Sequence, residues 1–337
     1  MSKAETGRLC VGVDLHKTQF TICALNEDGE YLLEKQYPTK EEGYSEFARE
    51  MHRFEEQGCS IELAVETTGN ARFFKNRMES EFFAVKVVNT NRFKVITMST
   101  KKTDANDAAT LAYYLMKDML PEAHLCSQTS EEIRRLLKTR SVLVQSMVKI
   151  KNQIHGMMLG YGIETKAAQL QSKRKRQELI NDLEDHNFSA YTAPSLKVML
   201  KILDDLSAEI KGIEKLLEEM VASNEDVALL MTVPGIGINT ATVIAAYTAE
   251  LERFEGNYKK FASYVGIIPS VHNSNETTHY GRITKHGPQE LRTAFVQAAL
   301  GMIRLTNVSS EWRIIKDYQR RKGDKGSGRA IIALARK

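Results

Sequence analysis

Residues 9–14, Leu-Cys-Val-Gly-Val-Asp, form a short apolar run that ends in a carboxylate. Residues 18–25 then alternate in the manner of a β-strand, and residues 31–37 alternate again after the turn Asn26-Glu27-Asp28-Gly29. Short β-prone runs separated by an Asp-Gly step are typical of strands joined by tight turns. This stretch therefore predicts three antiparallel strands in a meander.

Helices and strands alternate after the meander. A stripe of aromatic and apolar residues at helical spacing predicts a helix over 41–56. A strand over 61–66, a helix over 70–81, a strand over 83–88 and a helix from Asp104 follow. The order β-β-β-α-β-α-β-α is typical of an α/β ribonuclease-H-like domain, a mixed sheet with helices on both faces.

Four carboxylates are expected to meet at one edge of this sheet. Asp14 ends the first strand and Glu66 ends the fourth, and sites in open α/β sheets form at the carboxyl ends of strands. Asp104 and Asp107 lie three residues apart at the start of an Ala-rich helix, so they share one face. Taken singly, each acid is explained by helix capping or a solvated strand end. The four together favour a site for Mg²⁺ or Mn²⁺, which prefer hard oxygen ligands, and two such ions about 4 Å apart promote phosphoryl transfer.

The middle of the chain predicts two long helices. Residues 131–158 and 196–221 carry narrow heptad seams, and Arg140 interrupts the first. The spacing fits a coiled-coil hairpin, a dimerising coiled coil or an ordinary helical bundle. The basic run between the seams is typical of a solvated helix face, but on a nucleic-acid enzyme it can contact phosphates. Its cations are Lys173, Arg174, Lys175 and Arg176.

Residues 233–244, Val-Pro-Gly-Ile-Gly-Ile-Asn-Thr-Ala-Thr-Val-Ile, have the helix–hairpin–helix form. Gly235 and Gly237 permit a tight turn, and the next helix begins near Asn239 and Thr240, where free N–H groups can hold a DNA phosphate. A plain helix-to-helix turn is the alternative.

Polar and basic segments complete the chain. Residues 266–278 are expected to form a polar loop, after which Arg282, Lys285 and Arg292 are candidate phosphate ligands. The tail over 311–337 has nine Lys/Arg against three Asp/Glu, which predicts a mobile basic arm for nucleic acid or a solubilising tail. His272, His279 and His286 lie seven residues apart, but no Cys or carboxylate completes a zinc set.

Composition sets broad limits. The 337 residues are enough for two or three domains, and the net charge of +4 does not by itself indicate a nucleic-acid partner. Cys10, Cys23, Cys59 and Cys126 form no C-x-x-C motif, so free thiols in a reducing compartment are expected. No apolar run is long enough to span a bilayer and the start lacks a signal-peptide core, so a cytoplasmic protein is expected.

Three segments resemble the DEDD transposases, a family that includes insertion-sequence transposases and pilin-gene-inverting site-specific recombinases. They are Val11-Gly12-Val13-Asp14-Leu15-His16-Lys17, Val65-Glu66-Thr67-Thr68-Gly69 and Lys102-Thr103-Asp104-Ala105-Asn106-Asp107-Ala108, and the resemblance continues to the C-terminus.

The resemblance also implies a serine nucleophile. The family has a serine between a G-x-x-P segment and a G-[RG]-I-[ST]-K-x-G segment, and Ser274 matches that position. Asn273 and Asn275 stand where the family usually has a second serine and a glycine. Ser270 is the nearest alternative nucleophile.

The resemblance implies three domains and a DNA recombinase. The domains are a ribonuclease-H-like catalytic domain over 1–125, a coiled-coil helical linker over 126–224 and a mostly helical DNA-binding serine domain over 225–337. Donor and target DNA, a structured non-coding guide RNA, and a dimer or tetramer formed through the coiled coil are the expected partners. The alternatives are a Holliday-junction endonuclease that uses metal-activated water, and a non-catalytic nucleic-acid-binding protein in which the acids are caps.

Overall fold

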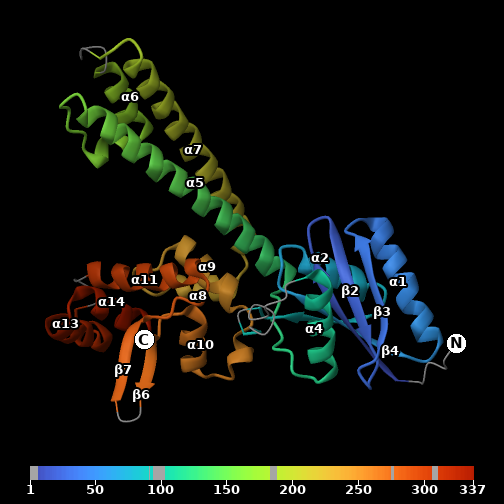
Figure 1. Cartoon of the computed structure of the whole chain (residues 1–337). Helices are drawn as coiled ribbons and strands as arrows, with labels where there is room; N and C mark the ends of the chain where they lie inside the picture. Colours follow the sequence, from blue (N-terminus) through green and yellow to red (C-terminus); the bar gives the residue numbers. More distant parts are fainter. Residues whose placement is uncertain (1–6, 91, 94–102, 183–187, 275–276, 306–309) are drawn as a thin grey trace. The chain divides into compact units, whose positions relative to one another are not determined.

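The structure is a computed structural model that describes residues 7–90, 92–93, 103–182, 188–274, 277–305 and 310–337. The chain divides into two compact units, Met1–Leu125 and Cys126–Lys337. Each unit is described by itself below (Figure 1).

The first unit is built on a five-stranded mixed sheet with the order β3-β2-β1-β4-β5. Strands β1, β2 and β3 pair antiparallel, whereas β4 pairs parallel with both β1 and β5. The predicted meander and the α/β class are therefore confirmed, and the topology is compatible with a ribonuclease-H-like fold. The elements are β1 (Arg8–Leu15), β2 (Gln19–Leu25), β3 (Tyr31–Pro38), α1 (Glu41–Glu56), β4 (Ser60–Glu66), α2 (Ala71–Glu79), β5 (Ala84–Val88) and α4 (Asp104–Met116).

Alternation along β1 gives the sheet two different faces. Leu9, Val11, Val13 and Leu15 join the large apolar core that holds the aromatic side chains of α1 and α2. The intervening residues face α4, and Cys10 packs in a second cluster with Leu111 and Leu115 of that helix. Helices α1 and α4 accordingly lie on different sides of the sheet (Figure 1).

Gly12 allows α4 to lie directly against β1. A Cβ atom at this position would be 2.0 Å from the carbonyl oxygen of Ala108, a distance that backbone packing does not permit. Asp14 lies two residues further along the strand and therefore on the same face. The absence of a side chain at position 12 thus helps to bring α4 beside the acidic end of β1.

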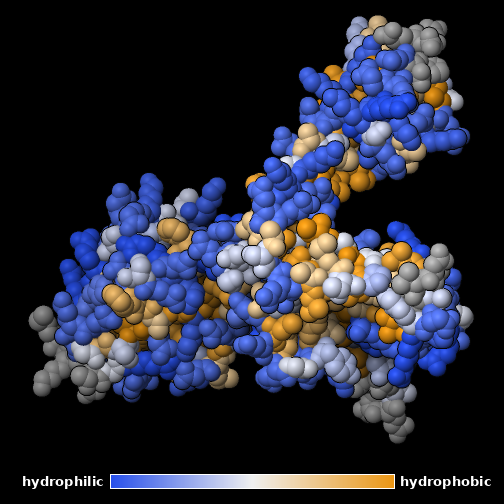
Figure 2. Space-filling view, turned by 180° about the vertical axis from the view of Figure 1, so that it is seen from behind, coloured by the Kyte–Doolittle hydropathy of each residue, from blue (hydrophilic) through white to orange (hydrophobic). Residues whose placement is uncertain are grey.

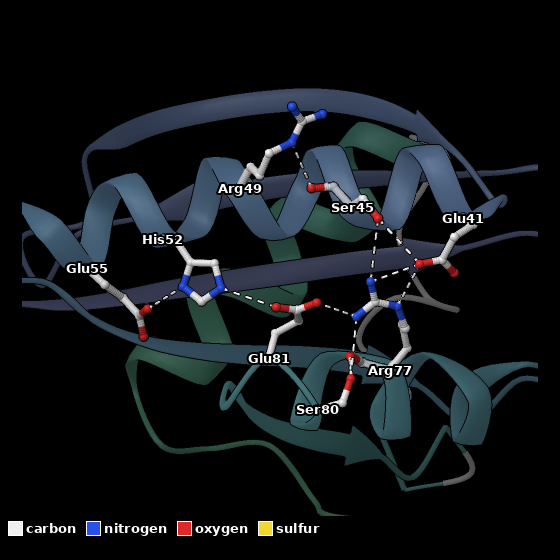
Figure 3. Close-up of polar contacts among 8 residues, drawn as sticks. All are labelled: Glu41, Ser45, Arg49, His52, Glu55, Arg77, Ser80 and Glu81. Atoms are coloured by element: carbon white, nitrogen blue, oxygen red, sulfur yellow. Dashed lines mark hydrogen bonds and ion pairs between the residues drawn. The ribbon is translucent and has the colours of Figure 1, made fainter.

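Ion pairs join α1 to α2 on the other side of the sheet (Figure 3). Arg77 of α2 contacts Glu41 of α1, with a separation of 2.9 Å from Nη2 to Oε1, and also contacts Glu81. His52 of α1 lies between Glu55 and Glu81. Because these side chains are partly exposed, each pair adds little free energy of unfolding, but together they fix the register of the two helices.

The second unit contains two long helices that pack side by side, α5 (Gln128–Leu159) and α7 (Thr192–Val221) (Figure 1). They correspond to the two predicted seams, and side chains from both fill shared apolar clusters. Arg140 interrupts the first seam because Glu214 of α7 faces it, at 2.9 Å from Nε and 2.7 Å from Nη2 to Oε1. Figure 2 shows mainly hydrophilic side chains over this helical hairpin, with apolar side chains along its length.

Shorter elements complete the second unit. After η1 (Ala167–Leu170) and α6 (Lys173–Asp182), which lie between the long helices in sequence, the remaining elements form a mostly helical region with one hairpin. They are α8 (Glu225–Met231), α9 (Ile238–Thr248), η2 (Leu251–Phe254), α10 (Tyr258–Val265), β6 (Pro269–Ser274), β7 (Thr277–Ile283), α11 (Gln289–Arg304), α13 (Arg313–Lys325) and α14 (Ser327–Ala335).

Two expectations for this region are wrong. The segment predicted as a polar loop contains the strand β6, which pairs antiparallel with β7. The tail predicted as a mobile arm forms α13 and α14, whose Ile315, Tyr318, Ala330 and Leu334 are buried in one cluster with Ala299 of α11. The net charge of the tail obscured its apolar residues at helical spacing.

No helix in the described part of the chain combines the length and apolar character needed to cross a membrane.

Candidate active site

The four predicted carboxylates converge at the carboxyl ends of β1 and β4. Val13 pairs with Val65 in the parallel register, so Asp14 and Glu66 are the next residues on neighbouring strands. The first turn of α4 supplies the other two acids, Asp104 and Asp107. Four residues that are distant in sequence thus reach one edge of the sheet.

Thr103, rather than either aspartate, is the N-cap of α4. Its hydroxyl oxygen accepts a hydrogen bond of 3.2 Å from the backbone N–H of Asn106. Asp104 and Asp107 occupy the first turn, where the helix dipole favours negative charge. Helix capping therefore does not account for Asp104 or Asp107, because Thr103 caps α4.

The pKa values show that the carboxylates share one electrostatic environment. Burial raises the pKa of Asp14, and the negative charges of Asp104 and Asp107 raise it further, against the opposing effect of His16. Burial likewise raises the pKa of Glu66, with additional contributions from Asp14 and Asp107. Such mutual repulsion is relieved when a cation binds among the acids.

His16 is a site residue that the sequence did not identify. Its Nε2 atom lies 3.1 Å from Asp14 Oδ2 and 3.4 Å from Asp104 Oδ1, and ligand atoms of these three residues all fall within 4.8 Å of one another. The backbone oxygen of His16 accepts hydrogen bonds of 3.1 Å from Thr39 Oγ1 and from Asn70 Nδ2, which fix the loop after β1. Its position two residues after a strand-end aspartate was the available signal.

The donor set fits a divalent cation. Most of the possible ligand atoms are oxygens of half-buried carboxylates, and the His16 imidazole supplies one nitrogen close to them. Hard oxygen ligands of this kind suit a divalent cation. Asp14, Glu66, Asp104 and Asp107, with His16 beside them, are the residues that could hold such an ion.

The segment predicted to form a helix–hairpin–helix turn joins α8 to α9. Gly235 has a φ of +92°, and a Cβ there would lie 2.6 Å from the backbone of Gly301 in α11, so this glycine serves close packing. Gly237 is exposed and faces open space, and no side chain caps the start of α9. Asn239 donates to Glu214 Oε1 at 3.3 Å, so its amide is used within the fold; Thr240 lies in the first turn of α9.

The three basic residues predicted to bind phosphate, one in β7 and two after it, differ in accessibility. Arg282 and Lys285 are exposed, and Lys285 has a left-handed φ of +57°, which is unusual for a residue with a side chain. Arg292 is half-buried and donates to the carbonyl oxygens of Val265 at 3.2 Å and Gly287 at 3.3 Å. Its guanidinium therefore joins the end of α10 to the start of α11.

Arg176 does not behave like the rest of its basic run. Its side chain is 2% exposed, and Nε and Nη2 bind Asp204 Oδ1 of α7 at 2.8 and 2.5 Å, while Nη1 binds the carbonyl of Leu170 at 3.0 Å. The phosphate contact predicted for Arg176 is thus unavailable in this structure, because the guanidinium anchors α6. Lys173, Arg174 and Lys175 are exposed.

Ser274 is the last residue of β6, where its backbone pairs with Thr277 of β7. The structure describes Ser274 by this strand position and not by its side chain. The alternative, Ser270, is half-buried, and a Cβ at Gly281 of the opposite strand would be 2.3 Å from its hydroxyl oxygen. Ser270 is therefore packed within its own hairpin.

Two family models match this chain. A model of DEDD transposases of the IS110 type, described as "Transposase", matches residues 11–163, and one described as "Transposase IS116/IS110/IS902 family" matches residues 227–313. Together they cover more than half of the chain, and the first includes all four carboxylates.

Similar proteins extend along nearly the whole sequence. The transposase for insertion sequence element IS1111A of Coxiella burnetii is 24% identical over 97% of this chain and 86% of its own length. The transposase for insertion sequence element IS1328 of Yersinia enterocolitica is 25% identical over 86% of this chain and 82% of its own length. A probable family 20 transposase of Pseudomonas aeruginosa is 21% identical over 90% of this chain and 87% of its own length. The chain belongs to the IS110-type family of DEDD transposases, enzymes that cut and rejoin DNA.

Proposed function

We propose that this transposase exchanges DNA strands through a divalent-metal site of four carboxylates and a serine nucleophile. The metal site is supported by the convergence of Asp14, Glu66, Asp104 and Asp107 at one edge of the sheet. The neighbouring carboxylates help to raise the pKa values of Asp14 and Glu66. The residues would hold Mg²⁺ or Mn²⁺ on the scissile phosphate. When bound, such an ion neutralises charge on the phosphate and on the leaving oxygen.

Ser274 is the proposed nucleophile. Its Oγ attacks the phosphorus, a phosphoserine ester forms, and the leaving DNA oxygen takes up a proton. A free DNA hydroxyl then attacks the same phosphorus and releases the serine, so the number of phosphodiester bonds is conserved and no external energy source is required. Support for Ser274 comes from the family resemblance and from its place at the end of β6, next to the turn of the β6–β7 hairpin. The exposed cations Arg282 and Lys285 lie at the opposite end of the hairpin.

DNA is the substrate, and the contacts proposed for it lie in the second unit. Gly237 and Thr240 at the start of α9, the exposed cations Arg282 and Lys285, and the outer cations of α6 are suited to phosphates. A structured non-coding RNA is proposed to choose donor and target DNA at the bacterial nucleoid, on the basis of the family resemblance alone.

Oligomerisation through the long helices is also proposed. The α5–α7 hairpin exposes apolar side chains that a second copy could cover as a coiled coil. They are Val142, Val148, Val198, Ile202, Leu216 and Met220.

Trapping of the protein–DNA ester tests the proposal. The full-length protein is incubated with Mg²⁺, end-labelled DNA that spans the ends of the element, and RNA transcribed from the element, and is then denatured and separated by electrophoresis. We expect a labelled adduct that Ser274→Ala and Asp104→Asn abolish and that Ser270→Ala retains. Undiminished cleavage by Ser274→Ala without an adduct would instead establish a water-using endonuclease.

A further inference from the structure

A cavity of about 740 Å³ opens beside the carboxylate site in the first unit. It lies between the loop after β1, the start of α1 and the loop that leads from β4 into α2. Its walls combine aromatic, cationic and small polar side chains. The lining residues used below are His16, Lys17, Lys40, Glu41, Tyr44 and Phe73.

Two aromatic rings form one side of this cavity. Tyr44 and Phe73 have ring centroids 5.6 Å apart. Phe73 lies in the first turn of α2 and is 56% exposed, whereas the next residue, Phe74, is fully buried. An exposed phenylalanine beside a cavity offers an apolar face to a flat ligand.

Tyr44 supplies a second observation that points to a ligand. The residue is 2% exposed, and its hydroxyl is buried without a hydrogen-bond partner among the described residues. A buried hydroxyl in that state raises the free energy of the empty protein, and a polar ligand in the cavity would satisfy it.

The charge of the cavity is positive. Lys17 and Lys40 are exposed, and the structure gives neither of them an ion pair within the described residues. The one carboxylate among the lining residues is Glu41, which pairs with Arg77 of α2, a cation that Glu81 also contacts (Figure 3). Among the lining residues the lysines therefore outnumber the carboxylates, which favours a phosphate at that side of the cavity.

His16 links the cavity to the carboxylates. It lines the cavity, and its Nε2 atom contacts both Asp14 and Asp104. A ligand in the cavity therefore lies next to the group bound by the acids.

We propose that this cavity binds one unpaired nucleotide of the DNA strand that flanks the scissile phosphate. The base stacks on Phe73, the phosphate lies between Lys17 and Lys40, and the Tyr44 hydroxyl donates a hydrogen bond to the nucleotide. The volume suits a single nucleotide and not a base pair in a duplex. This inference rests on the proposed function only in naming the flanking strand. An unpaired nucleotide at this position would leave the flanking DNA strand free to move to a new partner during strand exchange.

A fluorescent base tests the stacking. A DNA duplex with a single unpaired 2-aminopurine is titrated with the full-length protein in EDTA, so that binding is read without cleavage. We expect the fluorescence to be quenched, and Phe73→Ala to abolish quenching and weaken binding roughly tenfold, because stacking on an aromatic ring contributes about 1–3 kcal/mol per base. Phe73→Tyr should restore both. Tyr31→Ala removes an exposed aromatic side chain of β3 outside the cavity and should change neither.

Charge and hydroxyl variants test the other contacts. Lys17→Ala and Lys40→Ala should each lower the slope of log affinity against log salt concentration by about one, whereas Lys117→Ala, at the far end of α4, should not. Tyr44→Phe should weaken binding about fivefold and leave the melting temperature unchanged or higher, since it removes an unsatisfied group.

Two outcomes would overturn the proposal. One is equal affinity and undiminished quenching by Phe73→Ala and by the two lysine variants. The other is quenching of a matched RNA probe and not of the DNA probe, which would assign the cavity to RNA. Either outcome is independent of the adduct assay, because no serine chemistry occurs in EDTA, so failure here and failure of the proposed function are distinguishable.

Discussion

Asp14 shows how a binding site opposes the stability of the fold that holds it. Burial and neighbouring carboxylates raise its pKa, which means that the charged form is unfavourable in the metal-free protein. We expect Asp14→Asn to raise the free energy of unfolding without metal by about 1 kcal/mol at neutral pH. The same substitution should abolish the rise in melting temperature that Mg²⁺ or Mn²⁺ gives the unchanged protein. Glu34→Gln, an exposed control on β3, should change neither quantity, and a destabilised Asp14→Asn would contradict the argument.

The same acids predict a pH dependence. Because the pKa values of Asp14 and Glu66 are raised, the native protein binds more protons than the unfolded chain between about pH 4 and the raised values. The free energy of unfolding contributed by these groups therefore falls as the pH rises through that window. The free energy of unfolding is measured by denaturant titration at several pH values for the metal-free protein and for the double variant Asp14→Asn, Glu66→Gln. The value for the unchanged protein minus that for the variant should fall as the pH rises through the window. A difference that grows in favour of the unchanged protein with pH would refute the prediction.

The sequence predicted individual site residues only where local pattern decided the position. Asp14 and Glu66 were identifiable because each ends a strand, and their placement follows from the parallel register. Arg176 and His16 depend on partners that are distant in sequence, Asp204 for the first and Asp104 for the second. Nothing in a run of four cations distinguishes the one that packs inward.

At the level of elements, the contact between β1 and α4 determines whether the carboxylates meet. A Cβ at position 12 would overlap the carbonyl oxygen of Ala108, so the helix would have to move. We expect Gly12→Ala to lower the free energy of unfolding by about 3 kcal/mol. Hydrogen exchange of the amides in β1 and α4 should accelerate. Gly69→Ala places a methyl group in open space and should leave exchange unchanged; equal effects of the two substitutions would contradict the packing argument.

Two arginines of α6 are predicted to have different functions: Arg176 stabilises the packing of α6 on α7, whereas Arg174 contributes to nucleic-acid binding. Arg176→Ala leaves the Asp204 carboxylate without its partner, and the loss of a buried pair costs about 3–5 kcal/mol. Hydrogen exchange in α6 should therefore increase sharply. Arg174→Ala, whose side chain is 90% exposed, should leave exchange unchanged and lower only the salt dependence of DNA binding. Normal protection of α6 in Arg176→Ala would show that the pair is dispensable.

Element prediction succeeded where hydrophobic periodicity was strong. The strands of the first unit and the long helices α5 and α7 lie close to their expected ranges, because alternation and helical stripes are local signals. The β6–β7 hairpin was missed because its strands are polar, so the sequence shows no alternation of apolar and polar residues that would indicate a buried face. Helices α13 and α14 were missed because the many basic residues of the tail obscured its apolar residues, which form a core only against α11.

At the scale of the whole molecule, the carboxylates and Ser274 belong to different compact units of the chain. If the working site combines the acids of one subunit with the serine of another, two inactive proteins can restore each other. We expect a mixture of Asp104→Asn and Ser274→Ala to form the protein–DNA adduct at up to about half the level of the unchanged protein, since only mixed assemblies contain a complete site. Epitope tags of different size identify which variant carries the DNA, and it should be Asp104→Asn, which retains the serine. The doubly substituted protein mixed with Ser274→Ala is the control and should form no adduct, because neither partner has the hydroxyl. Absence of adduct from the complementary mixture, in subunits shown to exchange, would place both halves of the site on one chain.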